Sequence, residues 1–320
     1  PNLLNLIIMI EVGLISFCLS VIFLILSQRY FESKNIKDEI IGRSSHTESA
    51  TRNGGLAIFL SLFLISLFFY FQSKEVYDFS FIIPIGILFT IGLYDDVYQV
   101  DFKLKFIFQI IAAKVIIDQG LVISSLNGLL GFYEISYFFG QILSIFLIVL
   151  ISNAQNFSDG IDGLSITEAI KSFLIIIFIS NNGINSGLNF LIFVIICACI
   201  PFYYFNFKSS RKVFLGDSGS LFLGGVIAIG IINLINSIDL VDYQINTVFI
   251  ILICYLYPIV DLIRVVFLRL SNGESPFKAD KKHIHHYLLE KGYSHKQSLF
   301  LISFSFGIMQ IMIFLASAYV

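Results

Sequence analysis

Carboxylate side chains stand at the ends of hydrophobic stretches, where they could bind a divalent cation. Asp95 and Asp96 end one such stretch, and Asp101, Lys103 and Lys105 follow before the next. Adjacent carboxylates at a membrane surface suit magnesium, which prefers hard oxygen ligands and often bridges protein to phosphate oxygens. The alternative is a solvated pair that marks a helix end, although acids there oppose the dipole of the helix C-terminus. By themselves, Asp95 and Asp96 favour neither interpretation.

The segment NAQNFSDGIDGL, residues 153–164, combines amides with carboxylates. It carries Asn153, Asn156, Asp159 and Asp162. Two Asp residues three apart share a face if the segment is helical, and the glycine after each Asp would let the backbone approach a ligand closely. Asn, Asp and Gly are also ordinary turn formers, but that alternative does not explain why the connection lacks Lys and Arg. We therefore favour a functional role.

In FLGDSGSLFLGG, Asp217 lies immediately before a hydrophobic stretch. Its carboxylate would then sit at a helix start, where unpaired backbone N–H groups accept phosphate or a metal-phosphate assembly. The alternative is a simple N-cap, for which Ser218 and Ser220 are suitable. Both interpretations can hold for different residues.

A third polar segment, SPFKADKKHIHHYLLEKG at 275–292, mixes cations with imidazoles. Its charged and imidazole side chains are Lys278, Asp280, Lys281, Lys282, His283, His285 and His286. If the segment is helical, His283 and His286 share a face with Asp280, whereas His285 points away. A zinc site is the alternative, but this segment lacks the usual pair of histidines four residues apart with a Glu. Lysines and imidazoles together suit a polyanionic phosphate better.

The segment RSSHTESATRNGG near the start supplies Arg43, His46 and Arg52 before a Gly-Gly pair. By itself it equally fits a loop followed by a helix start.

The composition predicts an integral membrane protein. The 320 residues are 57% hydrophobic and 13% charged, with a mean hydropathy of +0.88, which is too apolar for a soluble domain. Apolar runs recur at 3–26, 54–72, 80–94, 104–118, 136–152, 164–180, 188–205, 219–238, 244–268 and 298–320. A helix needs about 20 residues to cross hydrocarbon, so we predict an all-α protein of about ten transmembrane helices. The short runs at 80–94 and 104–118 should either extend into their flanking motifs or cross a thinned region of the bilayer.

The basic residues predict the orientation, because short cytoplasmic loops carry the excess of Lys and Arg. Alternate connections at 27–53, 95–105, 153–163, 206–218 and 269–297 hold 16 of the 20 basic residues, and all five histidines. The polar motifs and the active site should therefore face the cytoplasm, with both termini on the other side.

We expect one polytopic domain, residues 1–320, whose longest cytoplasmic loops are 27–53 and 269–297. The first run lacks the features of a cleaved signal and should be a permanent span. Cys18, Cys197, Cys199 and Cys254 lie inside apolar runs, so we expect packing residues and neither disulfides nor zinc ligands.

Taken together and in this order, the motifs resemble the polyprenyl-phosphate N-acetylhexosamine-1-phosphate transferase family, over about residues 40–295. Five motifs agree: the Arg/His/Gly-Gly segment, the paired Asp, NxxNxxDGxDGL, GDxGSLxLG and ADxxHIHH. The first departs from the family, because Ser49 and Thr51 stand where prolines are common. The SPFKAD-HIHH form is similar to the N-acetylglucosamine-type branch and not to the muramyl-pentapeptide branch.

This resemblance implies transfer of a sugar 1-phosphate from a UDP-N-acetylhexosamine, such as UDP-N-acetylglucosamine, to undecaprenyl phosphate, with release of UMP. The product would start O-antigen, teichoic-acid or a similar glycan in the bacterial inner membrane. The implied cofactor is Mg²⁺, for which Mn²⁺ could substitute. The implied partners are the two substrates and the bilayer, with no nucleic acid, and a homodimer by analogy only.

The resemblance also implies roles for individual residues. Asp217 becomes the main metal ligand, with Asp159 beside it, and Asp95 and Asp96 lie beside the lipid phosphate. Lys105, four residues before Gln109, matches the family's phosphate-binding basic position. The implied catalytic set is Asp95, Asp96, Asp159 and Asp162. The implied substrate-binding set is Arg43, His46, Arg52, Lys105, Asn153, Asn156, Lys278, Asp280, His283, His285 and His286.

Phosphoryl transfer depends mostly on positioning and on neutralising charge. We favour direct attack by the lipid phosphate, and a covalent Asp-phosphate intermediate remains the alternative.

Two other classes of protein are alternatives to this transferase family. A cation- or proton-coupled transporter would use buried carboxylates such as Glu168 and Asp261, but the acidic motifs gather at one face and no inverted repeat is evident. A CDP-alcohol phosphotransferase would need Ala-Arg after its first Asp-Gly, where this chain has Leu164 and Ser165. Asp261 is expected to pair with Arg264 one turn on.

Overall fold

The chain folds as a bundle of long helices. The computed structural model describes residues 3–36, 50–74, 78–180, 187–237, 246–276 and 280–317. Within them the long helices are α1 (Leu3–Ser33), α2 (Gly54–Phe71), α3 (Ile82–Tyr98), α4 (Phe102–Asp118), α5 (Tyr137–Phe157), α6 (Leu164–Ile179), α7 (Gly187–Asn206), α8 (Gly216–Ser237), α9 (Thr247–Ser271) and α11 (His295–Ser317). The shorter elements are β1 (Ala50–Thr51), η1 (Phe79–Phe81), β2 (Ser125–Leu129), β3 (Phe132–Glu134), β4 (Lys212–Val213) and α10 (Ile284–Glu290).

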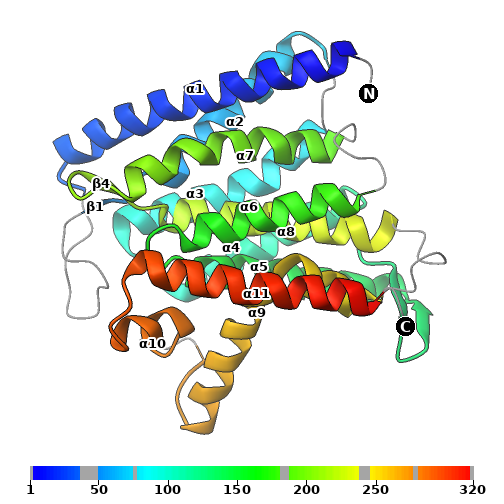
Figure 1. The fold of residues 1–320 in the computed structure, drawn as a ribbon. Helices are drawn as coiled ribbons and strands as arrows, with labels where there is room; N and C mark the ends of the chain where they lie inside the picture. The colour runs from blue at the N-terminus through cyan, green and yellow to red at the C-terminus, as the bar shows by residue number, and fades with distance from the viewer. Residues whose placement is uncertain are drawn as a thin grey trace.

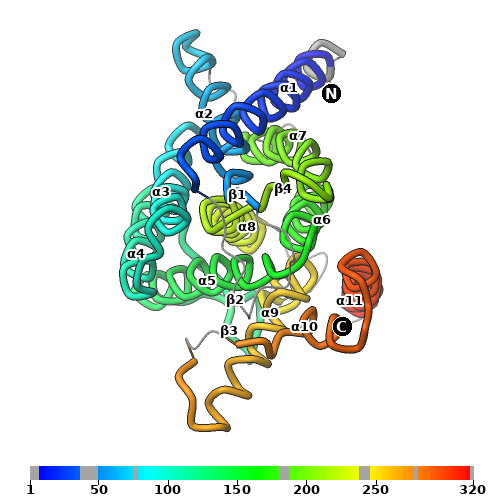
Figure 2. The backbone as a smooth tube through the Cα atoms, turned by 90° about the vertical axis from the view of Figure 1, so that its left-hand side faces the viewer, coloured from blue at the N-terminus to red at the C-terminus, as the bar shows by residue number. Residues whose placement is uncertain are grey.

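Helix α8 forms the centre of the bundle. Viewed end-on, it is enclosed by a ring of helices, while α11 lies outside the ring (Figure 2). In the most apolar 18-residue stretch of α8, 94% is buried inside the bundle, compared with 11% for the corresponding stretch of α11. A helix that is apolar on every side is stable at the centre of a bundle, so α8 can hold its first residues in one fixed place.

The predicted membrane character is confirmed. Eight helices in the described part of the chain are long and apolar enough to cross a membrane, by length and composition. Helices α4 and α6, with 17 and 16 residues, are shorter. The figure of ten spans and the orientation therefore stay predictions. As expected, α3 and α4 extend into their flanking motifs, since α3 includes Asp95 and Asp96.

Both of the long loops that the sequence predicts to be cytoplasmic are shorter than predicted. Helix α1 continues to Ser33, so the first begins later, and residues 37–49 lie outside the described part. In the second, α9 continues to Ser271, α11 begins at His295 and α10 lies between them. The apolar runs end before these helices do, because the final turns carry polar side chains such as Glu32 in α1 and Arg269 in α9.

The polar motifs gather at one end of the bundle. β1, β4 and α10 lie at the same end, and the β2–β3 hairpin lies at the opposite end near the C-terminus (Figure 1). β1 pairs in parallel with β4, with Ala50 opposite Lys212 and Thr51 opposite Val213. This pairing joins the chain just before α2 to the chain just before α8.

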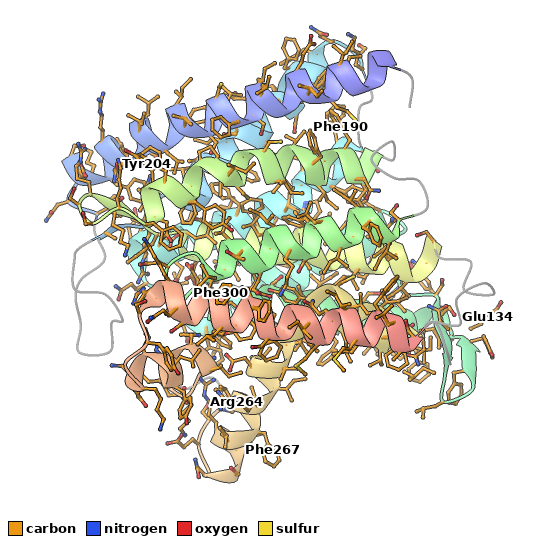
Figure 3. The ribbon with its side chains drawn as sticks, viewed as in Figure 1. Glu134, Phe190, Tyr204, Arg264, Phe267 and Phe300 are labelled. Atoms are coloured by element: carbon orange, nitrogen blue, oxygen red, sulfur yellow. The ribbon has the colours of Figure 1, made fainter. Side chains whose placement is uncertain are left out.

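Helix α9 is bent. Tyr255 has non-helical torsions (φ −147°, ψ 53°), three residues before Pro258. Proline removes one backbone hydrogen bond and clashes with the carbonyl four residues earlier, which produces such kinks. The second half of α9, which carries Arg264 and Phe267, projects away from the bundle (Figure 3). The bend opens space between this half and α4 and α5.

The four cysteines are free, and Cys199 and Cys254 are buried among core side chains. The expected packing role is confirmed for these two, whereas Cys197 is half-buried and Cys18 is exposed.

Candidate active site

Two carboxylates and one ammonium form the centre of the site. The Lys105 Nζ atom lies 2.9 Å from Asp217 Oδ2 and 3.3 Å from Asp95 Oδ2. The other oxygen of Asp95 accepts a hydrogen bond from the Val100 N–H at 2.9 Å. The three charged residues come from the end of α3, the start of α4 and the start of α8. Two negative charges therefore share one positive charge at the junction of these helices.

Asp96 has a different role from its neighbour. Its two oxygens accept hydrogen bonds from the backbone N–H groups of Asp217 and Ser218, both at 2.9 Å. It thus caps the N-terminus of α8 from a different helix, where a negative charge is stabilised. The prediction of free N–H groups at this helix start, ready for phosphate, is wrong. Ser220 is not the cap either, since its hydroxyl donates to the Gly216 carbonyl.

Glycines make the junction of α2, α3 and α8 possible. A Cβ on Gly55 would lie 2.0 Å from the Gly219 nitrogen, and one on Gly92 would lie 2.3 Å from the Asp217 carbonyl oxygen. A Cβ on Gly216, which has φ +76°, would lie 2.6 Å from the Asp96 carboxylate. These backbones can approach only without side chains, and that approach brings Asp96 to the start of α8.

The end of α5 adds amides to the centre. The Asn156 Nδ2 group donates to Ser220 Oγ at 2.9 Å, and Asn156 also hydrogen-bonds to Asp217. Asn153, one turn earlier, exchanges hydrogen bonds with Gln109 on α4, with N···O distances of 2.8 and 3.3 Å. Gln109, four residues after Lys105, is thus a partner of the amide motif.

Asp159 lies in the connection that follows α5. Burial raises the pKa of its carboxyl to about 7, and the negative charge of Asp217 adds to this effect, while the positive charge of Arg52 opposes it. A carboxyl that titrates near neutral pH readily releases its proton to solvent when a cation binds beside it, because the cation stabilises the ionised form. Arg52, predicted only weakly from sequence, therefore belongs electrostatically to the site.

Asp162 is held apart from the centre. Its Oδ2 atom lies 2.6 Å from Lys212 Nζ and 3.0 Å from His295 Nδ1. Although burial acts in the other direction, the hydrogen bonds from His295 and Lys212 lower the pKa of this carboxyl. The expected common face of Asp159 and Asp162 does not form, because residues 158–163 form turns and not a helix. Asp162 instead ties this turn to β4 and α11.

The two glycines of this turn do not leave room for a ligand. A Cβ on Gly160 would lie 2.1 Å from His285 Nε2, and one on Gly163, at φ +76°, would lie 2.6 Å from the Phe207 ring. The backbone is closely approached at both glycines, as expected, but by the side chains of His285 and Phe207 and not by a ligand.

The three histidines of the HIHH segment form one cluster. The ring centroids of His283 and His285 are 5.4 Å apart and nearly parallel, and those of His285 and His286 are 4.3 Å apart. The prediction that His285 points away is wrong, because His283 is the N-cap residue of α10 and the helical face rule does not apply to it. Burial, reinforced by the charges of neighbouring groups, lowers the pKa of His286 to about 4 and that of His285 well below its usual range.

The segment before this cluster is fastened to α9. The Arg269 guanidinium, 2% exposed, bonds both oxygens of Asp280 at 2.8 and 3.1 Å. Although burial opposes it, this pairing lowers the pKa of Asp280. Asp280 is thus engaged with the protein, and Arg269 is a site-shaping residue that the sequence did not single out. Lys278, like Arg43 and His46, lies outside the described residues.

The buried carboxylates considered as ion-path markers both have cationic partners. Glu168 lies 2.6 Å from Lys171, and Asp261 lies 3.1 Å from Arg264, as expected, and 2.7 Å from His283. Nothing in their surroundings favours a transport path.

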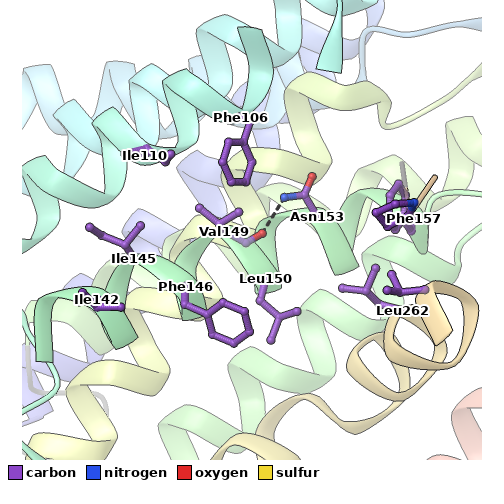
Figure 4. A pocket seen from close by; sticks show the side chains of 12 residues that line it. Phe106, Ile110, Ile142, Ile145, Phe146, Val149, Leu150, Asn153, Phe157 and Leu262 are labelled. Atoms are coloured by element: carbon purple, nitrogen blue, oxygen red, sulfur yellow. Dashed lines mark hydrogen bonds between the residues drawn. The ribbon is translucent and has the colours of Figure 1, made fainter. Parts of the chain in front are cut away.

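An apolar groove lies near the centre. It has a volume of about 430 Å³ between α4, α5 and the bent half of α9. Phe106, Phe146, Val149 and Leu262 line it, and Asn153 is its polar residue (Figure 4). Asn153, which lines the groove, lies one turn before Asn156, which hydrogen-bonds to Asp217, so the groove lies near the charged centre.

The donor atoms of the centre fit magnesium. Asp95 and Asp217 both contact the Lys105 ammonium, and the side chains around them carry amide and carboxylate oxygens. In the described part of the chain, no three His, Cys, Asp or Glu side chains form a ready metal cage. Magnesium usually binds through one or two carboxylates plus waters and substrate phosphates, so a carboxylate pair without a complete protein cage suits it.

Comparison with known proteins agrees with the motifs. The sequence profile of Glycosyl transferase family 4 matches residues 78–235. A probable undecaprenyl-phosphate N-acetylglucosaminyl 1-phosphate transferase of Bacillus subtilis is 31% identical over 284 residues, covering 86% of this chain and 76% of that protein. A decaprenyl-phosphate N-acetylglucosaminephosphotransferase of Mycobacterium tuberculosis is 31% identical over 83% of this chain and 72% of its own length.

The undecaprenyl-phosphate alpha-N-acetylglucosaminyl 1-phosphate transferase of Escherichia coli K12 is 27% identical over 90% of this chain and 78% of its own length. The extent of these matches decides the family. The chain belongs to the polyprenyl-phosphate N-acetylglucosamine-1-phosphate transferase family.

Proposed function

We propose that the protein transfers N-acetylhexosamine 1-phosphate from a UDP-sugar to undecaprenyl phosphate and releases UMP. The site would face the cytoplasm of the bacterial inner membrane, as the distribution of basic residues indicates. The lipid-linked product would start O-antigen, teichoic-acid or similar glycan synthesis. Among donors we favour UDP-N-acetylglucosamine, because the similar proteins are named for N-acetylglucosamine.

The observation that carries this proposal is an apolar groove that lies near a charged centre. Lys105 belongs to the centre and Phe106 to the groove, while Asn153 lines the groove one turn before Asn156. A substrate with a long apolar chain and a phosphate head matches this combination. The head would lie at Lys105 while the chain extends between α4, α5 and α9.

In the reaction, an oxygen of the lipid phosphate attacks the sugar-bearing phosphorus of the UDP-sugar. A new P–O bond forms, and the bond from that phosphorus to the UMP oxygen breaks with its electron pair. The Lys105 ammonium would hold the lipid phosphate and offset its charge. Mg²⁺, held by Asp217 with Asp159 and Asp95, would supply charge neutralisation for the diphosphate.

The surroundings of the two adjacent carboxylates favour direct attack over a covalent intermediate. Both oxygens of Asp96 accept backbone N–H bonds of α8, and both oxygens of Asp95 face donors, Val100 and Lys105. A carboxylate oxygen engaged in this way is a weakened nucleophile. The lipid phosphate monoester needs no such activation.

The test is UMP release and lipid-product formation by purified protein with undecaprenyl phosphate, Mg²⁺ and a panel of UDP-N-acetylhexosamines. Turnover with one donor is expected. Asp217→Asn should remain folded and lose turnover, because it removes a charge that Lys105 and the metal share. Asp118→Asn, an exposed carboxylate at the far end of α4, is the control and should keep full activity. No turnover by folded wild-type protein with any donor would contradict the proposal.

A further inference from the structure

We propose that Asp261 is a positioning residue for the histidine cluster, which it holds in one ring orientation and one tautomer for the UDP-sugar. This inference rests on the proposed function. Asp261 lies on the bent half of α9, is 3% exposed, and places its Oδ2 atom 2.7 Å from His283 Nδ1. It stands outside the sequence motifs that define the site.

Both oxygens of Asp261 are used. Oδ1 accepts the backbone N–H of Ile284 at 2.9 Å and lies 3.1 Å from Arg264. Arg264 also donates to the Lys282 carbonyl, so the carboxylate and its partner together hold the chain on either side of His283. One buried carboxylate thereby fixes both the backbone and the ring at the start of α10.

The chemistry of the contact determines the proton position on His283. An ionised carboxylate has only acceptors, so the imidazole nitrogen that faces it, Nδ1, must carry a hydrogen. A neutral His283 therefore carries its proton on Nδ1, and Nε2 is left as an acceptor for a hydroxyl or N–H group of the UDP-sugar. A carboxylate that orients a functional imidazole in this way is a recurrent device in enzymes.

The orientation of His283 extends to the rest of the site. Its ring is nearly parallel to that of His285, at an interplanar angle of 9°, and lies 5.6 Å from the Phe157 ring at the end of α5. His285 in turn packs against Gly160, next to Asp159. A rotation of His283 would therefore disturb the turn that carries the candidate metal ligand.

Asp261→Asn tests the tautomer. The Asn Oδ1 atom can still accept the Ile284 N–H, but its amide donates toward Nδ1 and so moves the imidazole proton to Nε2. Hydrogen bonds to charged groups contribute about 1.5–3 kcal/mol, so kcat/KM for the UDP-sugar should fall roughly 10- to 100-fold, and UDP should bind more weakly in a thermal-shift titration. Glu168→Gln is the matched control, because Glu168 is fully buried and paired with Lys171; it should change neither UDP affinity nor KM.

If the proposal is right, Asp261→Asn lowers kcat/KM only through its effect on the His283 imidazole. In a His283→Gln background, Asp261→Asn should cost little more, since residues that act as one unit are strongly non-additive. An equal additional loss in that background would overturn the proposal, as would a wild-type kcat/KM for Asp261→Asn. If Asp261→Asn is not recovered folded, Asp261→Glu takes its place, because it keeps the charge but moves the carboxylate. Its kcat/KM is then compared in the wild-type and His283→Gln backgrounds in the same way. If wild-type protein binds UDP but turns over no donor, the proposed function fails, while the UDP titration still decides the role of Asp261.

Discussion

Lys105 occupies the position between two carboxylates where a divalent cation would be attracted, and this predicts competition between lysine and metal. Its Nζ atom contacts Asp217 Oδ2 at 2.9 Å and Asp95 Oδ2 at 3.3 Å. A metal ion must displace the ammonium from at least one of these contacts. We expect Lys105→Met to lose turnover and, at the same time, to bind Mn²⁺ more tightly than the wild type.

The magnitude follows from the contacts. A charge-assisted hydrogen bond contributes about 1.5–3 kcal/mol, and the Lys105 side chain is 23% exposed, which favours the lower part of that range. Since 1.4 kcal/mol corresponds to a factor of ten, loss of one contact should tighten Mn²⁺ binding by roughly 10- to 30-fold. Removal of the cation from the reacting phosphates should lower kcat by about 100-fold or more.

The assay is Mn²⁺ binding measured by electron paramagnetic resonance in detergent, without substrates, so that turnover does not enter. Lys103→Met is the control, because Lys103 lies half a turn earlier on the same helix and is exposed; its Mn²⁺ affinity should equal the wild-type value. Weaker or unchanged Mn²⁺ binding by Lys105→Met would refute the idea that lysine and metal compete for these carboxylates.

Three further perturbations test the packing, the protonation and the groove. Gly55→Ala should prevent recovery of folded protein in size-exclusion chromatography, because its Cβ would lie 2.0 Å from the Gly219 nitrogen, whereas Gly86→Ala, whose nearest atom is 3.5 Å away, should be recovered normally. The melting temperature should fall as the pH is lowered from about 6.5 to about 4, because the unfolded chain takes up a proton that folded His286, with its pKa lowered to about 4 by burial, does not; the fall should be smaller in His286→Asn, and an identical pH profile would contradict this. Val149→Trp should fill the groove and raise KM for the lipid substrate at least several-fold with little effect on UDP affinity, and an unchanged lipid KM would argue that the lipid binds elsewhere.

Much of the architecture could be predicted from hydropathy alone, because lipid requires every backbone polar group to be bonded within a helix. The predicted apolar runs correspond to the long helices, although α3 continues through Asp95 and Asp96 to Tyr98. Helix ends were less predictable. Helix α1 runs to Ser33 and α9 to Ser271, because turns that carry polar side chains leave no apolar signal.

The types of residue in the site were also evident from sequence, but their roles were not. Asp95 and Asp96 are adjacent and chemically identical in the chain, yet one faces Lys105 and the other caps α8. Neighbouring residues on a helix point about 100° apart, so they meet different elements. Only the packing of α3 against α8 decides which carboxylate meets which partner.

The sequence by itself determined that this is a membrane protein with acidic, amide and imidazole motifs at one end, because residue type and hydrophobic length are local properties. The tertiary structure alone decided which of these residues act together. Asp162 is drawn from the centre by Lys212, and Asp261, more than twenty residues away in the chain, becomes the partner of His283. Such pairings depend on distances between elements that are remote in sequence, and the bend of α9 at Tyr255 and the glycine contacts of α8 set those distances.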